Sequence, residues 1–213
     1  MNLPLLFGSA FVVALSGALM PGPLLTVTVA HSPRFGWTFG PLAILGHAIL
    51  ELGLISLVFL GAGPLLKSGG VQSIVGLVGG AILIWMSWGM VAMARAGGGT
   101  GTQEGAVEGS NRAVWLGILT SISNPYWTLW WATVGLAFLT TAAKSGPLGI
   151  AVFFLGHISG DLAWYTLVSV GAARGKKLLG TPLYSGVLFL CAAILVVLGV
   201  WFVWYGARLA LNL

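Results

Sequence analysis

Two histidine–acid pairs are the residues in this sequence best suited to chemistry. His47 precedes Glu51 by four positions in one apolar stretch, and His157 precedes Asp161 by four positions in another. Residues four apart share a helix face, so each imidazole can hydrogen-bond its own carboxyl group. The pairs can bind protons or a substrate ammonium group, or supply nitrogen and oxygen ligands to a divalent metal ion if the helices meet. The alternative is a structural pair that locks neighbouring helices.

Two proline-containing breaks are the second chemical feature. Pro21-Gly22-Pro23 and Asn124-Pro125 interrupt apolar stretches, and proline lacks the N–H that continues a helix. We predict that a helix restarts at each break and leaves unpaired N–H groups at 24–26 and 126–128, which suit a substrate carboxylate. A kink that only shapes packing is the alternative. The candidate substrate-binding residues are Pro21, Gly22, Pro23, Leu24, Asn124, Pro125 and Tyr126.

The composition is that of a membrane protein. Apolar residues make up 58% of the 213 positions and charged residues only 6%, against roughly 25% in soluble domains. Six apolar stretches each exceed the about 20 residues that cross a bilayer. We therefore predict an all-α membrane protein with six transmembrane helices, of which the first and fourth are broken by proline. The stretches are 3–30, 39–61, 70–93, 113–141, 147–172 and 182–210.

The same composition excludes several classes of protein. A soluble enzyme does not fit, and no catalytic motif or phosphate-binding loop is found in the sequence, so we expect neither an enzyme nor a cofactor. The single cysteine, Cys191, cannot form an internal disulfide. The net charge of +5 comes from few residues, which we attribute to loops that face anionic lipid rather than to nucleic-acid binding.

The chain contains an internal repeat. Each half has a proline-broken stretch followed by a stretch with Gly-His-x-x-x-acid, and residues 94–112 form a glycine-rich linker between residues 1–93 and 113–213. Each half holds three helices, an odd number, so the second half enters the membrane from the opposite face. This is the inverted-repeat plan of secondary transporters, in which interrupted helices mark the binding site.

Basic residues predict the orientation. Six of them fall on one side of the expected membrane and three on the other, and the richer side is expected to be cytoplasmic, with both termini outside. The richer side has Arg34, Arg95, Arg112, Arg174, Lys176 and Lys177, and the other has Lys67, Lys144 and Arg208.

The sequence resembles the LysE/RhtB family of amino-acid exporters over essentially its whole length. The resemblance rests on Gly17 followed by Pro21-Gly22-Pro23, on Asn124-Pro125, and on the glycines Gly36, Gly40 and Gly46. It implies a multi-pass exporter of amino acids or similar solutes in a prokaryotic plasma membrane, driven by the proton gradient. The chain departs from the common family pattern at His47 and Tyr126, near the expected site.

We therefore expect a secondary transporter that exports amino acids or related small solutes, with protons and membrane lipid as its other partners. The two broken turns are expected to hold a substrate carboxylate, while Glu51 and Asp161, tuned by His47 and His157, exchange protons or hold the ammonium group. A divalent metal-ion transporter that uses the same four residues and a non-transporting membrane subunit are the alternatives. Assembly of the chain into a homo-oligomer is also compatible with the sequence.

Overall fold

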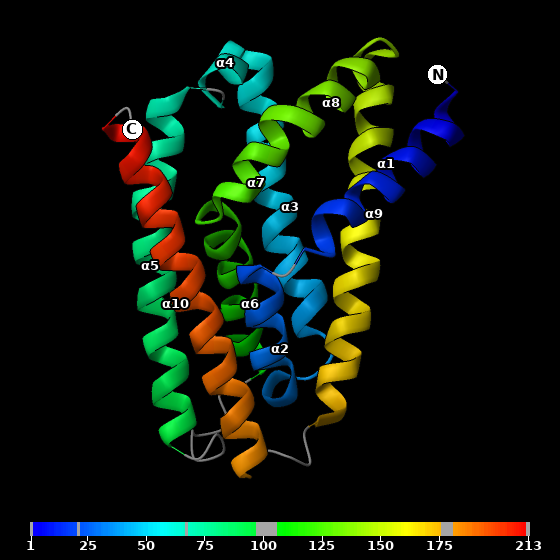
Figure 1. Cartoon of the computed structure of the whole chain (residues 1–213). Helices are drawn as coiled ribbons and strands as arrows, with labels where there is room; N and C mark the ends of the chain where they lie inside the picture. The colour runs from blue at the N-terminus through cyan, green and yellow to red at the C-terminus, as the bar shows by residue number, and fades with distance from the viewer. Residues whose placement is uncertain (1, 21, 67, 97–105, 176–180, 212–213) are drawn as a thin grey trace.

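The computed structural model describes residues 2–20, 22–66, 68–96, 106–175 and 181–211, and every regular element in these ranges is helical. The helices run mostly lengthwise in one elongated bundle (Figure 1). Their bounds are α1 (Leu3–Ala18), α2 (Pro23–Phe35), α3 (Phe39–Leu57), the π-helical turn η1 (Val58–Ala62), α4 (Gly63–Leu66), α5 (Gly69–Arg95), α6 (Ala106–Ile122), α7 (Pro125–Trp130), the π-helical turn η2 (Trp131–Gly135), α8 (Leu136–Ala143), α9 (Gly146–Ala173) and α10 (Pro182–Ala210).

Both expected breaks are present. The first stretch divides into α1 and α2, whose axes are bent by 81°, and the chain between them is extended at Gly22, with φ −141° and ψ −175°. The stretch 113–141 divides at Asn124, where φ is −102° and ψ is 104°, before Pro125 opens α7. Pro23 and Pro125 both stand in the first turn of a helix, where a missing N–H costs nothing. Pro21 lies outside the described residues.

Within the described ranges, four unbroken helices are long and apolar enough to cross a membrane, and the bent α1–α2 pair makes up to five. The chain is thus a multi-pass helical membrane protein. The sixth expected span is not confirmed, because the break at Asn124 leaves α6 with 17 residues and α7 with six. The four unbroken spans are Phe39–Gly61, Gly69–Arg95, Gly146–Ala173 and Pro182–Ala210.

Close helix contacts position the two acid-bearing helices. α5 lies along α10, α1 packs against α9, α6 packs against α3, and α3 also contacts α9. The α1–α9 contact depends on small residues, since a Cβ at Gly160 would lie 2.7 Å from the carbonyl oxygen of Phe11. Small residues let membrane helices approach at backbone distance. This packing brings α3 and α9, with their histidine–acid pairs, side by side.

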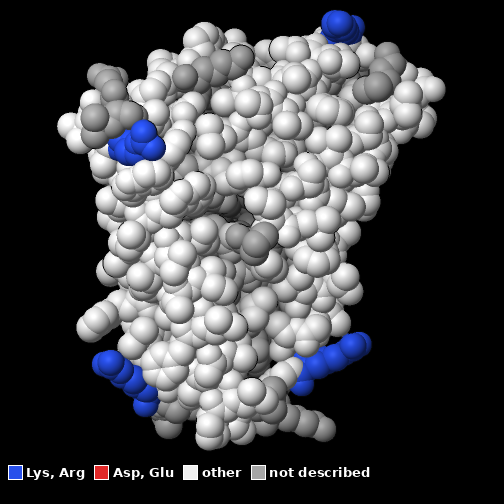
Figure 2. Space-filling model, in the orientation of Figure 1, with Lys and Arg blue, Asp and Glu red and all other residues white. Residues whose placement is uncertain are grey.

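Basic side chains mark the two ends of the molecule. On the face in Figure 2, blue side chains gather at the two ends, no red is visible, and the belt between is uncharged. Both termini lie at one end of the bundle (Figure 1), whereas Arg34 and Arg95 occupy the last turns of α2 and α5, which end at the opposite end. Of the expected linker 94–112, residues 97–105 lie outside the described residues, and α6 begins at Ala106.

Candidate functional site

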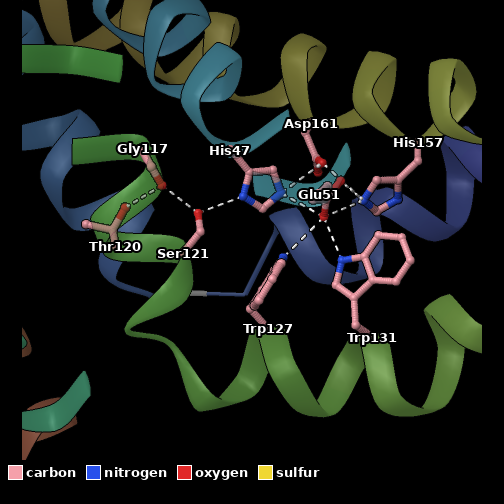
Figure 3. Close-up of polar contacts among 9 residues, drawn as sticks. All are labelled: His47, Glu51, Gly117, Thr120, Ser121, Trp127, Trp131, His157 and Asp161. Atoms are coloured by element: carbon pink, nitrogen blue, oxygen red, sulfur yellow. Dashed lines mark hydrogen bonds and ion pairs between the residues drawn. The ribbon is translucent and has the colours of Figure 1, made fainter. Parts of the chain in front are cut away.

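The two histidine–acid pairs meet in the middle of the bundle. His47 and Glu51 come from α3, His157 and Asp161 come from α9, and all four are buried, with at most 8% of any residue exposed (Figure 3). The Nε2 atom of His47 lies 3.1 Å from Glu51 Oε1 and 3.7 Å from Asp161 Oδ2. The Nε2 atom of His157 lies 3.2 Å from Glu51 Oε2 and 3.4 Å from Asp161 Oδ2. Each imidazole therefore faces both acids. We call these four residues the His–acid centre.

Glu51 is held by donors from a third element. The indole Nε1 groups of Trp127 and Trp131 donate to Glu51 Oε1 at 3.2 and 2.8 Å. These two tryptophans are four residues apart, in the first turn of α7 and at the start of η2, so both indoles face the carboxyl group (Figure 3). An indole nitrogen only donates, so Oε1 acts as an acceptor and the carboxyl group is fixed in place.

His47 is oriented by α6. Its Nδ1 atom lies 2.7 Å from Ser121 Oγ, and that hydroxyl group donates to the carbonyl oxygen of Gly117 at 2.7 Å. Since the single hydroxyl hydrogen is used on Gly117, Ser121 accepts from His47 Nδ1–H. The other ring nitrogen, Nε2, then points at the acids with its lone pair or a second proton available.

Three buried atoms of the His–acid centre have no hydrogen-bond partner. They are Glu51 Oε2, Asp161 Oδ2 and His157 Nδ1. The ring of His157 packs among aromatic rings, with centroids 4.9 Å from Trp130 and 6.0 Å from Phe153. Buried polar atoms are normally paired, and unpaired ones are common where a site acts on a ligand. The acids thus keep acceptor capacity for a bound species.

A cavity of about 170 Å³ joins the His–acid centre to both helix breaks. A Cβ at Gly22 would lie 3.8 Å from Asn124 Nδ2, so the two breaks lie side by side in its wall. Trp130, whose indole Nε1 has no hydrogen-bond partner, also lines the cavity. Figure 2 shows a hollow in the surface about midway between the charged ends. The predicted residues that line the cavity are Gly22, Pro23, Leu24, His47, Glu51, Asn124, Tyr126, His157 and Asp161.

The two helix starts differ, which corrects the prediction of two equivalent anion sites. At α2, Gly22 supplies no side-chain cap and Thr26 N–H bonds the Gly22 carbonyl, so the unpaired donors are those of Leu24 and Leu25. At α7, by contrast, Asn124 satisfies the helix start itself. Its Oδ1 accepts from Tyr126 N–H at 3.1 Å, and its carbonyl oxygen accepts from the N–H groups of Trp127 and Thr128.

Sequence reasoning missed Trp127, Trp131 and Ser121 as parts of the site. The spacing of the two tryptophans was a usable signal, because residues four apart on a half-helix directly after a break share one face. Nothing in the sequence marked Ser121, since a serine near a helix end is ordinary. Asn-Pro, in contrast, is a known helix-start pair, with asparagine as the cap and proline in the first turn.

Replacing Asn124 by alanine is expected to disturb both the fold and the cavity. The change removes the cap of α7, which contributes about 0.5–2 kcal/mol to stability, and the amide that faces Gly22. The matched control is Asn2→Ala, because Asn2 Oδ1 also caps a helix, α1, by accepting from Leu5 N–H at 2.9 Å. Asn2 does not line the cavity. Thermal unfolding should show similar losses for both variants, whereas solute binding should fall only in Asn124→Ala. Equal binding in the two would show that the amide has no part in the site.

Comparison with known proteins agrees with this architecture. A search of the curated proteins and a search of the solved structures found no match to this chain. The family model for LysE type translocators matches residues 15–206, which include both breaks and the whole His–acid centre. The chain therefore belongs to the LysE type translocator family.

Proposed function

We propose that this protein exports amino acids or related small solutes across a prokaryotic plasma membrane in exchange for protons. Its family consists of translocators, so the broad class is transport. The observation that carries the narrower proposal is a cavity in which both kinds of partner meet, because it is lined both by a helix start with unpaired N–H donors and by two buried acids. An amino acid has a carboxylate, which needs hydrogen-bond donors, and an ammonium group, which needs negatively charged acceptors.

The donors on one side of the cavity suit the carboxylate. The N–H groups of Leu24 and Leu25 have no partner within the helix at the positive end of α2, Leu24 lines the cavity, and the amide of Asn124 lies beside this helix start. Trp130 adds an indole N–H that has no other partner. The volume of about 170 Å³ is slightly above the about 150 Å³ that accepts benzene, which favours a small amino acid.

The acids on the other side suit a cation or protons. A charge in the middle of a membrane is costly unless it is neutralised, by about 2.5–3.5 kcal/mol or more on insertion scales. Glu51 and Asp161 can be neutralised by protons shared with the two imidazoles, or by the ammonium group of the substrate. Exchange between these two states couples solute movement to proton movement.

The packing supports an inverted repeat as the mechanical basis of transport. If α1 corresponds to α6 and α9 to α3, the contact of α1 with α9 has its counterpart in the contact of α6 with α3, and α5 pairs with α10. Such an exchange of partners is what a twofold relation between the halves requires. Alternating access would then rock one half against the other around the cavity. The end that carries Arg34 and Arg95, opposite both termini, would face the cytoplasm.

The test is solute counterflow in proteoliposomes. Vesicles with the purified protein are loaded with an amino-acid mixture, a pH gradient is imposed, and the released solutes are read by mass spectrometry. We expect acid-dependent release of one amino-acid class. The double variant Glu51→Gln/Asp161→Asn should insert normally and release none. Glu104→Gln/Glu108→Gln, which changes the only other acids in the sequence, is the matched control and should behave like the parent protein.

Two results would contradict the proposal. If folded, correctly inserted protein moves no amino acid in either direction, amino acids are not its solute. If the double variant keeps full acid-dependent release, the two acids do not couple protons to transport.

A further inference from the structure

We propose that the His–acid centre binds one divalent transition-metal ion of the zinc class. His47, Glu51, His157 and Asp161 each offer one ligand atom, and these four atoms lie within 4.8 Å of one another. Two imidazole nitrogens with two carboxylate oxygens form a donor set that zinc accepts in proteins. The proposal rests on the centre alone and does not require an amino acid to be the transported solute.

The spacing of the ligand atoms fits a tetrahedral ion. With metal–ligand bonds of about 2.0–2.1 Å, neighbouring ligands of a tetrahedral site lie about 3.3 Å apart. The Nε2 atom of His47 lies 3.1 Å from Glu51 Oε1 and 3.7 Å from Asp161 Oδ2. The Nε2 atom of His157 lies 3.2 and 3.4 Å from the same two acids. These four separations are close to the tetrahedral value, and the four ligand atoms all lie within 4.8 Å of one another, so the more distant of them have to draw together around a bound ion.

Each acid also has an oxygen that is available to a cation. Asp161 Oδ2 is close to both imidazoles, and yet it accepts no hydrogen bond. Glu51 Oε2 likewise has no hydrogen-bond partner, although Glu51 is only 1% exposed and Asp161 only 5%. Buried carboxylate oxygens without donors are costly when nothing binds them. A cation between them would satisfy both oxygens at once.

The surrounding contacts are those that hold metal ligands in place. Histidine ligands commonly donate their second ring N–H to a neighbouring acceptor, and carboxylate ligands are commonly hydrogen-bonded in turn. His47 donates from Nδ1 to Ser121, which leaves Nε2 for a ligand (Figure 3). Glu51 accepts from the two indoles at Oε1, whereas Oε2, 3.2 Å from His157 Nε2, has no hydrogen-bond partner. Because Nδ1 of His157 has no such partner, we expect His47 to be the stronger ligand.

Charge decides which ion fits. Two carboxylates and two neutral imidazoles carry two negative charges, which a divalent ion cancels, and a neutral centre is the least costly one inside a membrane. Calcium takes six to eight oxygen ligands, and magnesium demands octahedral oxygen coordination, so neither suits a site with two nitrogen ligands. Imidazole instead favours zinc and its neighbours in the transition series.

The test measures metal binding at equilibrium, without transport. Tag-free protein in lipid nanodiscs is stripped of metal and titrated with Zn²⁺, and bound metal is counted by elemental analysis. Co²⁺ is added separately, because the intensity of its visible absorption reports tetrahedral coordination. We expect one Zn²⁺ per chain, a tetrahedral Co²⁺ spectrum, and no displacement of Zn²⁺ by Mg²⁺.

Variants identify the ligands. His47→Asn keeps an N–H near the position of Nδ1 but lacks Nε2, so it should lose binding while the fold is retained. Ser121→Ala removes only the outer contact and should weaken binding by about 10- to 100-fold. His31→Asn is the matched control, since His31 is also buried but bonds the backbone of Val27 in α2, outside the centre. It should bind Zn²⁺ like the parent protein.

The result is separable from that of the transport assay. Folded protein that holds no stoichiometric Zn²⁺, or His47→Asn protein that holds as much as the parent, would overturn the metal site even if amino acids are exported. One Zn²⁺ per chain, lost in His47→Asn and kept in His31→Asn, would establish it even if no amino acid moves.

Discussion

Replacing Glu51 alone by glutamine is expected to lower acid-driven transport by at least about 100-fold. Glu51 contacts both imidazoles and accepts from Trp127 and Trp131. A hydrogen bond to a charged group contributes about 1.5–3 kcal/mol, and each 1.4 kcal/mol or so is a factor of ten in rate. Because the charge of Glu51 is lost at several contacts at once, the flux should fall by at least about 100-fold. The measurement is initial flux in proteoliposomes under an imposed pH gradient.

The reason for choosing glutamine is that it keeps the shape. Its amide oxygen can still accept from the two indoles, so the variant should fold, and its NH₂ group then replaces Oε2, which lies 3.2 Å from His157 Nε2. What disappears is the negative charge. A loss of flux with unchanged thermal unfolding would therefore report on the chemistry of the centre and not on its packing.

Asp161→Asn is the informative comparison. Asp161 Oδ2 lies near both imidazoles but accepts no hydrogen bond, whereas Glu51 is held by α7 and η2 as well. We therefore expect a smaller loss, of about tenfold, which corresponds to one contact with a charged group. Equal losses in the two variants would mean that the charge of Glu51 matters no more for transport than that of Asp161. Full flux in Glu51→Gln would refute a proton-coupling role for Glu51.

The meeting of the two histidine–acid pairs was predictable because it depends on local spacing and on the repeat. A separation of four residues places His47 with Glu51 and His157 with Asp161 on helix faces wherever the helices go. Buried charges in an apolar stretch must then find partners, and the nearest candidates are each other. The breaks were predictable for an equally local reason, since proline removes a donor at a fixed position.

What could not be predicted depends on contacts between distant helices. The bonds from Trp127 and Trp131 to Glu51 join residues 76 and 80 positions apart, and no periodicity in the sequence indicates which neighbour an indole will face. The difference between the two helix starts is another case. It arises because Asn124 has a side chain that caps α7 and Gly22 has none, and the prediction erred by treating both breaks as prolines alone.

Replacing Gly46 by alanine is expected to separate α3 from α6 and to inactivate the site without touching it. A Cβ at Gly46 would clash with the carbonyl oxygen of Val114 and lie 3.2 Å from the backbone nitrogen of Ile118. The contact is reciprocal, because a Cβ at Gly117 would clash with the backbone of Ala43. Backbone atoms cannot rotate away as side-chain ends can, so the helices themselves must move apart.

The cost of that movement should appear in both stability and transport. Overpacking typically costs about 1–3 kcal/mol, and each kcal/mol lowers the unfolding midpoint by about 2–4 °C in a chain of this size. His47 follows Gly46 directly, and Ser121 stands one turn after Gly117, so a wider gap would also break the 2.7 Å contact that orients His47. Thermal unfolding in detergent and flux in proteoliposomes measure the two effects.

Gly53→Ala is the matched control on the same helix. A Cβ at Gly53 would have nothing within 4 Å, and alanine is a better helix former than glycine by about 1 kcal/mol, so this variant should be as stable as the parent or more so. If Gly46→Ala is equally well tolerated, α3 and α6 do not touch at backbone distance. If it unfolds earlier and loses transport while Gly53→Ala keeps both, the close contact of these two helices is what holds His47 toward the acids.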